Sequence, residues 1–147
     1  MHRFTGALLA LCLLSCDDFL FGEATGEGTE VPDTADYAGV LEVLESNCFG
    51  CHGAAGTLGG LDLETDMYGA TVGVVGQYGL PIVLAGDPDN SMLYLKAANL
   101  HPPNTGTDMP PGSGGLPDAL SDVILLWIED GAPDANGNSS IEDDTGI

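Results

Sequence analysis

Five consecutive residues, Cys48-Phe49-Gly50-Cys51-His52, place two thiols and an imidazole at the spacing C-x-x-C-H. Two thiols at this spacing can add to the two vinyl groups on one edge of a haem and form thioether bonds. The adjacent histidine then lies under the porphyrin ring, where its imidazole can bind the iron as an axial ligand. The spacing therefore predicts one covalently attached haem (haem c), with Cys48 and Cys51 as anchors and His52 as ligand.

Three other uses of these residues compete with haem attachment. A thioredoxin-like C-x-x-C follows a strand, whereas here a helix-like segment precedes the motif and a glycine-rich segment follows it. Structural zinc needs four ligands, so His52 or His101 would have to complete a site at an unusual spacing. A disulfide between Cys48 and Cys51 would close a very small, strained loop. Haem attachment is the favoured interpretation.

The N-terminal segment has the pattern of an export signal. His2 and Arg3 precede an apolar run over residues 6–14, which is shorter than the roughly 20 residues that span a bilayer as a helix. The run ends in LLSC at Cys16, which resembles a bacterial lipobox and implies cleavage before that cysteine and its acylation. A cleaved signal without lipid is the alternative. We therefore expect a lipoprotein signal peptide over residues 1–15, a membrane anchor at Cys16, and a cell-envelope location, either facing the periplasm or at the cell surface.

The charge of the chain restricts its partners. All 23 acidic residues follow residue 15, where Lys96 is the only Lys or Arg. Binding of nucleic acid requires a basic surface. We expect no such surface on a chain this acidic, so nucleic acid is not an expected partner. A redox partner with a basic docking face would be attracted, at a rate that falls as salt rises. The alternative is that the charge serves only solubility.

Apolar periodicity predicts two principal helices. The first covers residues 34–47, with apolar residues at i, i+3, i+4 and i+7, and either Asp33 or Thr34 as its cap. The last covers residues 121–130, is capped by Ser121 or Asp118, and ends at Gly131. Its apolar face consists of Val123, Ile124, Trp127 and Ile128.

Shorter elements are expected between the two principal helices. Asp87-Pro88 and Ser91 predict a short helix that contains Met92 to Leu95. Residues 65–72 can form another turn or two, and the β-like runs 61–63 and 82–84 could pair as a minor hairpin. Aromatic residues make up 6% of the chain and glycine is abundant, so we expect haem to supply much of the apolar surface of the core.

The flanking segments differ in composition from this central part. Residues 16–33 are predicted to be an acidic flexible tether, residues 34–134 a single domain, and residues 135–147 an acidic disordered tail. Asp134 to Ser140 resembles the start of a calcium-binding loop. The EF-hand pattern needs glycine at its sixth place and glutamate at its twelfth, where this chain has Ser139 and Thr145. Disorder is therefore favoured over calcium binding.

Five segments of the chain resemble a known family in their order and content. They are CFGCHG (48–53), GGLDL (59–63), AGDPDNSML (85–93), DMPPG (108–112) and WIEDGAP (127–133). They resemble the class I mono-haem cytochrome c fold, and in particular the small cytochrome c-like domains of planctomycetes and myxobacteria. The resemblance implies an all-α domain, with a few short helices and Gly/Pro-rich loops around one covalently bound haem, and with its terminal helices crossed.

The second axial ligand is expected to be Met109. The prolines after it stiffen the loop, and in the resembling domains the Met-Pro pair carries the ligand. A thioether stabilises ferrous iron and raises the reduction potential. Met67 and Met92 fit better as hydrophobic filling. His101 is the main competitor, and an open distal position is the remaining alternative.

These features together predict a lipid-anchored c-type cytochrome that carries single electrons and is not an enzyme. The alternatives are a haem-based sensor or structural module, or a peroxidase-like haem protein. The last would need a distal position that is open or ligated by His101.

Overall fold

The computed structural model describes residues 35–141 of the chain. The predicted signal peptide, Cys16 and the tether over residues 16–33 lie outside the described residues, as do Thr34 and residues 142–147. Between residues 35 and 141, no helix has the length and apolar character needed to cross a membrane.

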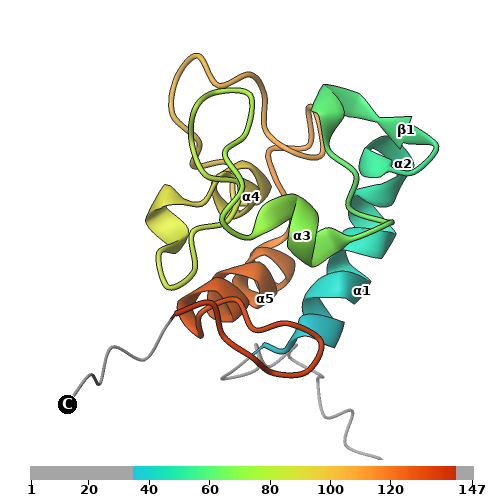
Figure 1. Ribbon diagram of the computed structural model, residues 1–147. Coiled ribbons are helices and arrows are strands. Elements are labelled where there is room, and N and C mark those ends of the chain that lie inside the picture. The colour runs from blue at the N-terminus through green and yellow to red at the C-terminus, as the bar shows by residue number, and fades with distance from the viewer. Residues whose placement is uncertain (1–34, 142–147) are drawn as a thin grey trace, which may run out of the picture.

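The described part of the chain is mostly helical and contains no sheet, in agreement with the expected all-α class (Figure 1). Two 3-10 turns and one very short strand accompany the helices. The elements in chain order are α1 (Tyr37–Asn47), α2 (Phe49–His52), β1 (Gly56–Thr57), η1 (Leu58–Gly60), α3 (Met67–Thr71), η2 (Pro88–Asn90), α4 (Met92–Ala97) and α5 (Asp118–Glu129).

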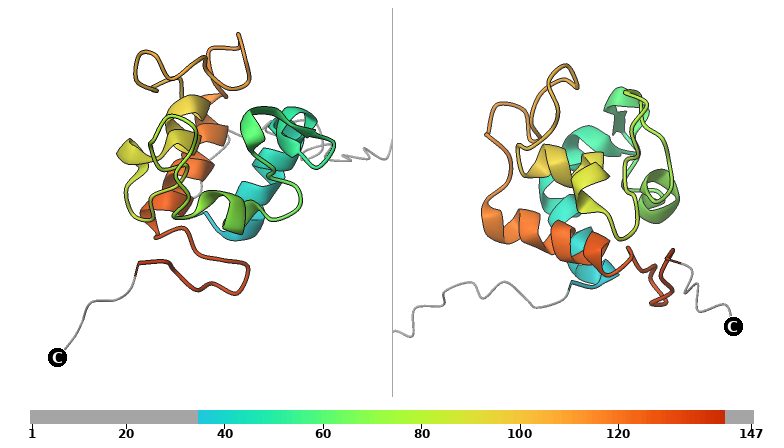
Figure 2. Two further views of the ribbon diagram at one scale, coloured as in Figure 1. Left: turned by 45° about the horizontal axis from the view of Figure 1, so that its top comes forward. Right: turned by 90° about the vertical axis from the view of Figure 1, so that its left-hand side faces the viewer.

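The first and last helices pack against each other and form the base of the domain (Figures 1 and 2). Val40 and Leu44 of α1 are fully buried, as are Ile124, Trp127 and Ile128 of α5. Each set recurs at intervals of three or four residues, so each helix presents a continuous apolar stripe to the other. The helix α4 also packs against α5.

Both principal helices are confirmed, but their caps are not those predicted. α1 begins at Tyr37, and the carboxylate of Asp36 accepts a hydrogen bond from the Gly39 N–H at 2.8 Å. α5 begins at Asp118 after Pro117, and the Ser121 hydroxyl donates to the Asp118 carbonyl inside the helix. Before α1 several residues that can cap stand close together, so composition does not select one of them. At the start of α5 no side chain caps the helix, and Pro117 occupies the cap position.

The end of the last helix is as predicted. Gly131 has φ 88°, a left-handed conformation that favours glycine. The Ala132 N–H donates to the Trp127 carbonyl at 2.9 Å and completes the turn.

The predicted hairpin between residues 61–63 and 82–84 is wrong. Val83 instead bridges Val72, and the Leu63 N–H donates to the His52 carbonyl at 2.7 Å. Antiparallel pairs occur elsewhere in this region, between β1 and residues 52–53 and between Val75 and Pro81. Each β-like run finds its hydrogen-bond partner in a segment nearer to it in the chain.

The residues after α5 fold back onto the domain as far as the structure describes them. The carboxylate of Asp134 accepts hydrogen bonds from the Asn136 and Asn138 N–H groups at 2.8 and 2.9 Å. The Ser140 N–H donates to the Gly131 carbonyl at 3.1 Å, and its hydroxyl is hydrogen-bonded to that of Tyr68. Residues 135–141 therefore form a turn held against the helices.

Candidate functional site

A cavity of about 620 Å³ lies above the crossing of α1 and α5. Its walls come from α1, α2, α4 and α5, from the loops over residues 58–63 and 74–82, and from the loop that carries Met109. Most of the side chains that line it are apolar, among them Leu44, Leu61, Leu63, Val74, Ile82, Leu93, Leu116 and Ile124. A cavity of this size with few polar groups is suited to a largely apolar ligand.

The junction between α1 and α2 positions the C-x-x-C-H residues. The Cys48 N–H donates to the Leu44 carbonyl at 2.7 Å, and the His52 N–H donates to the Cys48 carbonyl at 2.8 Å. The motif is therefore helical from Phe49 to His52, and Cys48 joins α2 to the end of α1. Cys48 and His52 line the cavity, whereas Cys51 is exposed beside it.

The environment of Cys48 does not favour thiol–disulfide exchange. Burial of its thiol and the neighbouring Cys51 raise the pKa of Cys48 to about 11. A thiol with such a pKa stays protonated near neutral pH, and the thiolate is the attacking species in exchange reactions. The helix before the motif also differs from the strand that precedes a thioredoxin-like C-x-x-C.

The side chain of His52 has a buried nitrogen without a partner. Nδ1 is buried and makes no hydrogen bond to any of residues 35–141. Such a nitrogen is costly to bury unless a group other than residues 35–141 binds it. An imidazole of this kind lies on an apolar wall next to the two cysteines. It is therefore suited to bind a haem iron.

Met109 reaches the same cavity from a distant part of the sequence. It is half-buried, and its N–H donates to the Lys96 carbonyl on α4 at 3.1 Å. The donor set of the cavity is thus a thiol, an imidazole and a thioether, and this set fits an iron porphyrin held through C-x-x-C-H. Met92 is a buried residue of α4 that also lines the cavity, and Met67 is buried in the core.

His101, the competing ligand, lies outside the set of residues that line the cavity. Its Nδ1 is 3.0 Å from the Thr105 hydroxyl and 3.3 Å from the Pro102 carbonyl oxygen. These contacts hold the ring within its own loop. The structure therefore brings Cys48, His52 and Met109 to one cavity and leaves His101 apart from them.

Two charged residues of the site region were missed by the sequence predictions. Lys96 lines the cavity, and the Asp108 carboxylate accepts hydrogen bonds from the Thr107 hydroxyl at 2.6 Å and the Gly114 N–H at 2.7 Å. These bonds lower the pKa of Asp108 to about 2, so it is ionised near neutral pH. Only one signal was available in the sequence, namely that Lys96 is the chain's single lysine.

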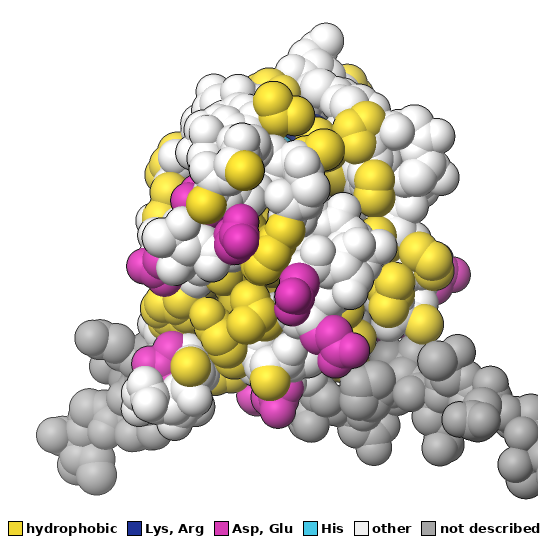
Figure 3. Space-filling model, turned by 90° about the vertical axis from the view of Figure 1, so that its right-hand side faces the viewer, with side chains coloured by type: hydrophobic (Ala, Val, Ile, Leu, Met, Phe, Trp, Pro, Cys, Tyr) yellow, Lys and Arg dark blue, Asp and Glu magenta, His cyan; other side chains and the backbone are white. Residues whose placement is uncertain are grey.

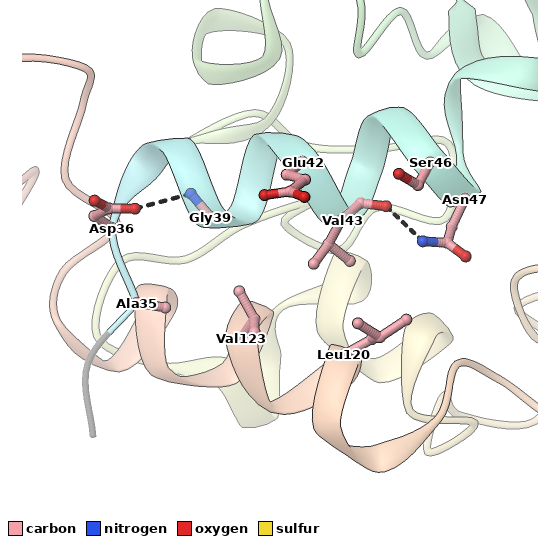
Figure 4. A pocket seen from close by; sticks show the side chains of 9 residues that line it. All are labelled: Ala35, Asp36, Gly39, Glu42, Val43, Ser46, Asn47, Leu120 and Val123. Atoms are coloured by element: carbon pink, nitrogen blue, oxygen red, sulfur yellow. Dashed lines mark hydrogen bonds between the residues drawn. The ribbon is translucent and has the colours of Figure 1, made fainter. Parts of the chain in front are cut away.

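A second groove, of about 720 Å³, runs between α1 and α5 (Figure 4). Val43, Leu120 and Val123 lie between the two helices there. Asp36 is already bound to the Gly39 N–H, and Asn47 donates to the Val43 carbonyl. The groove has no thiol, imidazole or thioether among its lining residues, so the candidate site is the other cavity.

The zinc alternative receives no support from the arrangement of side chains. Within residues 35–141, no three or more His, Cys, Asp or Glu side chains gather where they could hold a metal ion. His52 and the cysteines beside it therefore lack the further ligands that structural zinc requires.

A small helical domain with C-x-x-C-H on the wall of an apolar cavity has the features of a cytochrome c-like domain. Residues 48–113 match the family model described as Planctomycete cytochrome C, and this part of the chain is a cytochrome c-like domain of the planctomycete type. The match runs from Cys48 past Met109, and the predicted resemblance to the cytochrome c-like domains of planctomycetes is confirmed. No curated protein and no solved structure matches the chain. Cytochrome c domains hold haem covalently and are generally electron carriers.

Proposed function

We propose that this protein carries single electrons through one haem, attached by thioether bonds to Cys48 and Cys51 and bound axially by His52 and Met109. One observation carries the proposal: Cys48, His52 and Met109 line the same apolar cavity, although Met109 lies far from the motif in the sequence. The crossed α1 and α5 below the cavity support a class I cytochrome c arrangement.

The haem, when bound, supplies the one-electron chemistry, and the chain tunes it. The apolar walls exclude water and lower the local dielectric constant around the cofactor. A thioether ligand from Met109 stabilises the ferrous state and raises the reduction potential. No bond in a substrate needs to form or break, so the protein acts as a carrier and not as an enzyme.

The proposed place of action is outside the cytoplasm. The lipobox-like sequence at Cys16 supports an acylated N-terminus and a tether over residues 16–33 between the membrane and the domain. Attachment of haem to C-x-x-C-H takes place outside the cytoplasm in bacteria, which agrees with export. The protein would thus be a lipoprotein of the cell envelope.

The surface charge supports a basic redox partner. Acidic side chains are scattered among hydrophobic ones on the face drawn in Figure 3, and the whole chain has a formal net charge of −21. A basic docking face on the partner would speed the encounter of the two proteins, and salt would weaken that effect.

A sensor or a peroxidase-like protein would require an open distal position or ligation by His101. Met109 on the cavity wall and the bonds that hold His101 to its own loop both favour the carrier. A closed, six-coordinate iron is therefore expected.

The first experiment is production of the full chain in a bacterium that attaches c-type haem. Haem should stay with the polypeptide on a denaturing gel, and the oxidised protein should show the weak near-red band of sulfur bound to ferric haem iron. The double substitution Cys48→Ser, Cys51→Ser should abolish the haem stain, while Ser46→Ala on α1 should leave it unchanged. Wild-type protein without covalent haem would overturn the proposal.

A further inference from the structure

The ammonium group of Lys96 is bound to the loop that precedes Met109. Its Nζ donates to the carbonyl oxygens of Thr105 and Thr107 at 2.6 and 2.7 Å. It also lies 5.4 Å from the centroid of the Tyr78 ring, within the range of a cation–π interaction. Two backbone carbonyls and one aromatic ring, from two loops, therefore surround the Lys96 ammonium group.

The backbone of the same residue holds the next part of the loop. The Lys96 carbonyl accepts the Met109 N–H at 3.1 Å. Lys96 thus contacts the loop at residues 105, 107 and 109, and both Lys96 and Met109 line the cavity. Hydrogen bonds from a charged donor are stronger than those between neutral groups, so the ammonium is a firm attachment point.

The loop has the local conformation that this attachment requires. Gly106 stands between the two carbonyls that bind Nζ and has φ 85°, which L side chains rarely adopt. A Cβ at this position would lie 2.6 Å from the Tyr78 hydroxyl oxygen and 3.6 Å from Nζ. Glycine therefore allows the loop to approach Lys96 and Tyr78 closely.

We infer that Lys96 is a positioning residue that holds residues 105–109 on α4 and so keeps the Met109 side chain on the wall of the cavity. The inference rests on the proposed function in one respect, that Met109 is the thioether ligand. This role explains why the single lysine of a very acidic chain lies at this position. Its ammonium provides hydrogen-bond donors, which a neutral side chain of similar length such as methionine lacks. Lys96 acts through Met109 and does not itself bind the iron.

Four variants of the haem-loaded full chain test this inference. Lys96→Met removes the donors and the charge but keeps an apolar side chain of similar length. Lys96→Arg keeps both donors and charge. Gly106→Val keeps Lys96 but prevents the close approach of the loop. Ser46→Asp, on the exposed side of α1, changes the net charge as Lys96→Met does and is the matched control.

Two measurements are made on each variant. The first is the near-red sulfur-to-iron band of the oxidised protein. The second is hydrogen exchange at the Met109 amide, whose N–H is bound to the Lys96 carbonyl. Lys96→Met and Gly106→Val should both lose the band, and their Met109 amide should exchange at least about tenfold faster. Lys96→Arg and Ser46→Asp should keep the band and the slow exchange.

Wild-type band and wild-type exchange in Lys96→Met would overturn the inference. If Lys96→Met does not fold, Gly106→Val decides by the same two measurements. Failure of the proposed function looks different, because the wild type itself would then lack the sulfur-to-iron band. In that case the exchange rate alone decides whether Lys96 holds the loop in place.

Discussion

The indole Nε1 of Trp127 donates a hydrogen bond to the Pro133 carbonyl oxygen at 2.9 Å. This bond joins the last turn of α5 to the segment that follows it, and the indole ring itself is fully buried in the core. The same side chain therefore packs α5 against α1 and fixes the direction in which the chain leaves the helix.

Replacement of this tryptophan should destabilise the domain. Trp127→Phe removes the donor to Pro133 and part of the buried ring, at an expected cost of about 1–3 kcal/mol in the free energy of unfolding. Chemical unfolding followed by circular dichroism measures the change. Leu100→Ala, at a position 61% exposed, should change stability by no more than about 0.5 kcal/mol. Equal stability of the two variants would contradict this assignment of Trp127 to the core.

The two principal helices could be predicted from the sequence because the apolar pattern that stabilises each of them lies within its own segment. Apolar residues at intervals of three and four produce the stripes that α1 and α5 bury, and Gly131 marks the end of α5 by its backbone preference. The first turns could not be predicted in detail. Asp33, Thr34 and Asp36 can all cap a helix, and the choice of Asp36 depends on how the chain enters the domain.

The site was predictable where its chemistry is encoded in consecutive residues. The five residues of C-x-x-C-H need no tertiary information, whereas the attachment of the Met109 loop joins Lys96 to carbonyls nine and eleven residues further on. Backbone carbonyls are present at every position, so no residue type signals that one of them will accept a bond. The incorrect hairpin between residues 61–63 and 82–84 has the same origin, because β-like composition does not specify a partner.

Met109 and Met92 both line the cavity, and matched substitutions should separate their roles. Met109→Leu keeps the size of the side chain but removes the sulfur, so the near-red band should disappear and the reduced protein should bind carbon monoxide. Met92→Leu makes the same change on α4 and should keep the band and exclude carbon monoxide. Optical spectra of both purified proteins check this. A band that survives in Met109→Leu but is lost in Met92→Leu would move the ligand to Met92.

Cys16 should determine the attachment of the protein to the membrane. The wild type, expressed in a bacterium with lipoprotein processing, should sediment with membranes and incorporate labelled fatty acid. Cys16→Ala should abolish the labelling, because no acyl chain can then be attached to the mature N-terminus. The haem stain of the exported fraction serves as the control for folding. Unlabelled wild-type protein in the soluble exported fraction would instead indicate a signal peptide without a lipid anchor.

The turn after α5 should make stability depend on pH through Asp134. Hydrogen bonds from Asn138 and Asn136 lower the pKa of Asp134 to about 2, below its value in the unfolded chain of about 3.9. A carboxyl whose pKa is depressed by folding stabilises the folded state above the unfolded pKa, and this contribution is lost as pH falls through the folded pKa. The wild type should therefore exceed Asp134→Asn in stability at pH 5, and the difference should shrink between about pH 4 and pH 2.

The donors of this turn provide an independent check on that assignment. Asn138→Ala removes the side-chain amide that contacts both carboxylate oxygens of Asp134, at 3.2 and 3.1 Å, but leaves the carboxyl itself in place. Its pH dependence should lie between those of the wild type and Asp134→Asn, because the backbone N–H groups of residues 136 and 138 still donate. Urea unfolding at pH 5, 3.5 and 2 measures all three proteins. A wild-type advantage over Asp134→Asn that stays constant across these pH values would show that the carboxylate charge contributes nothing to the turn.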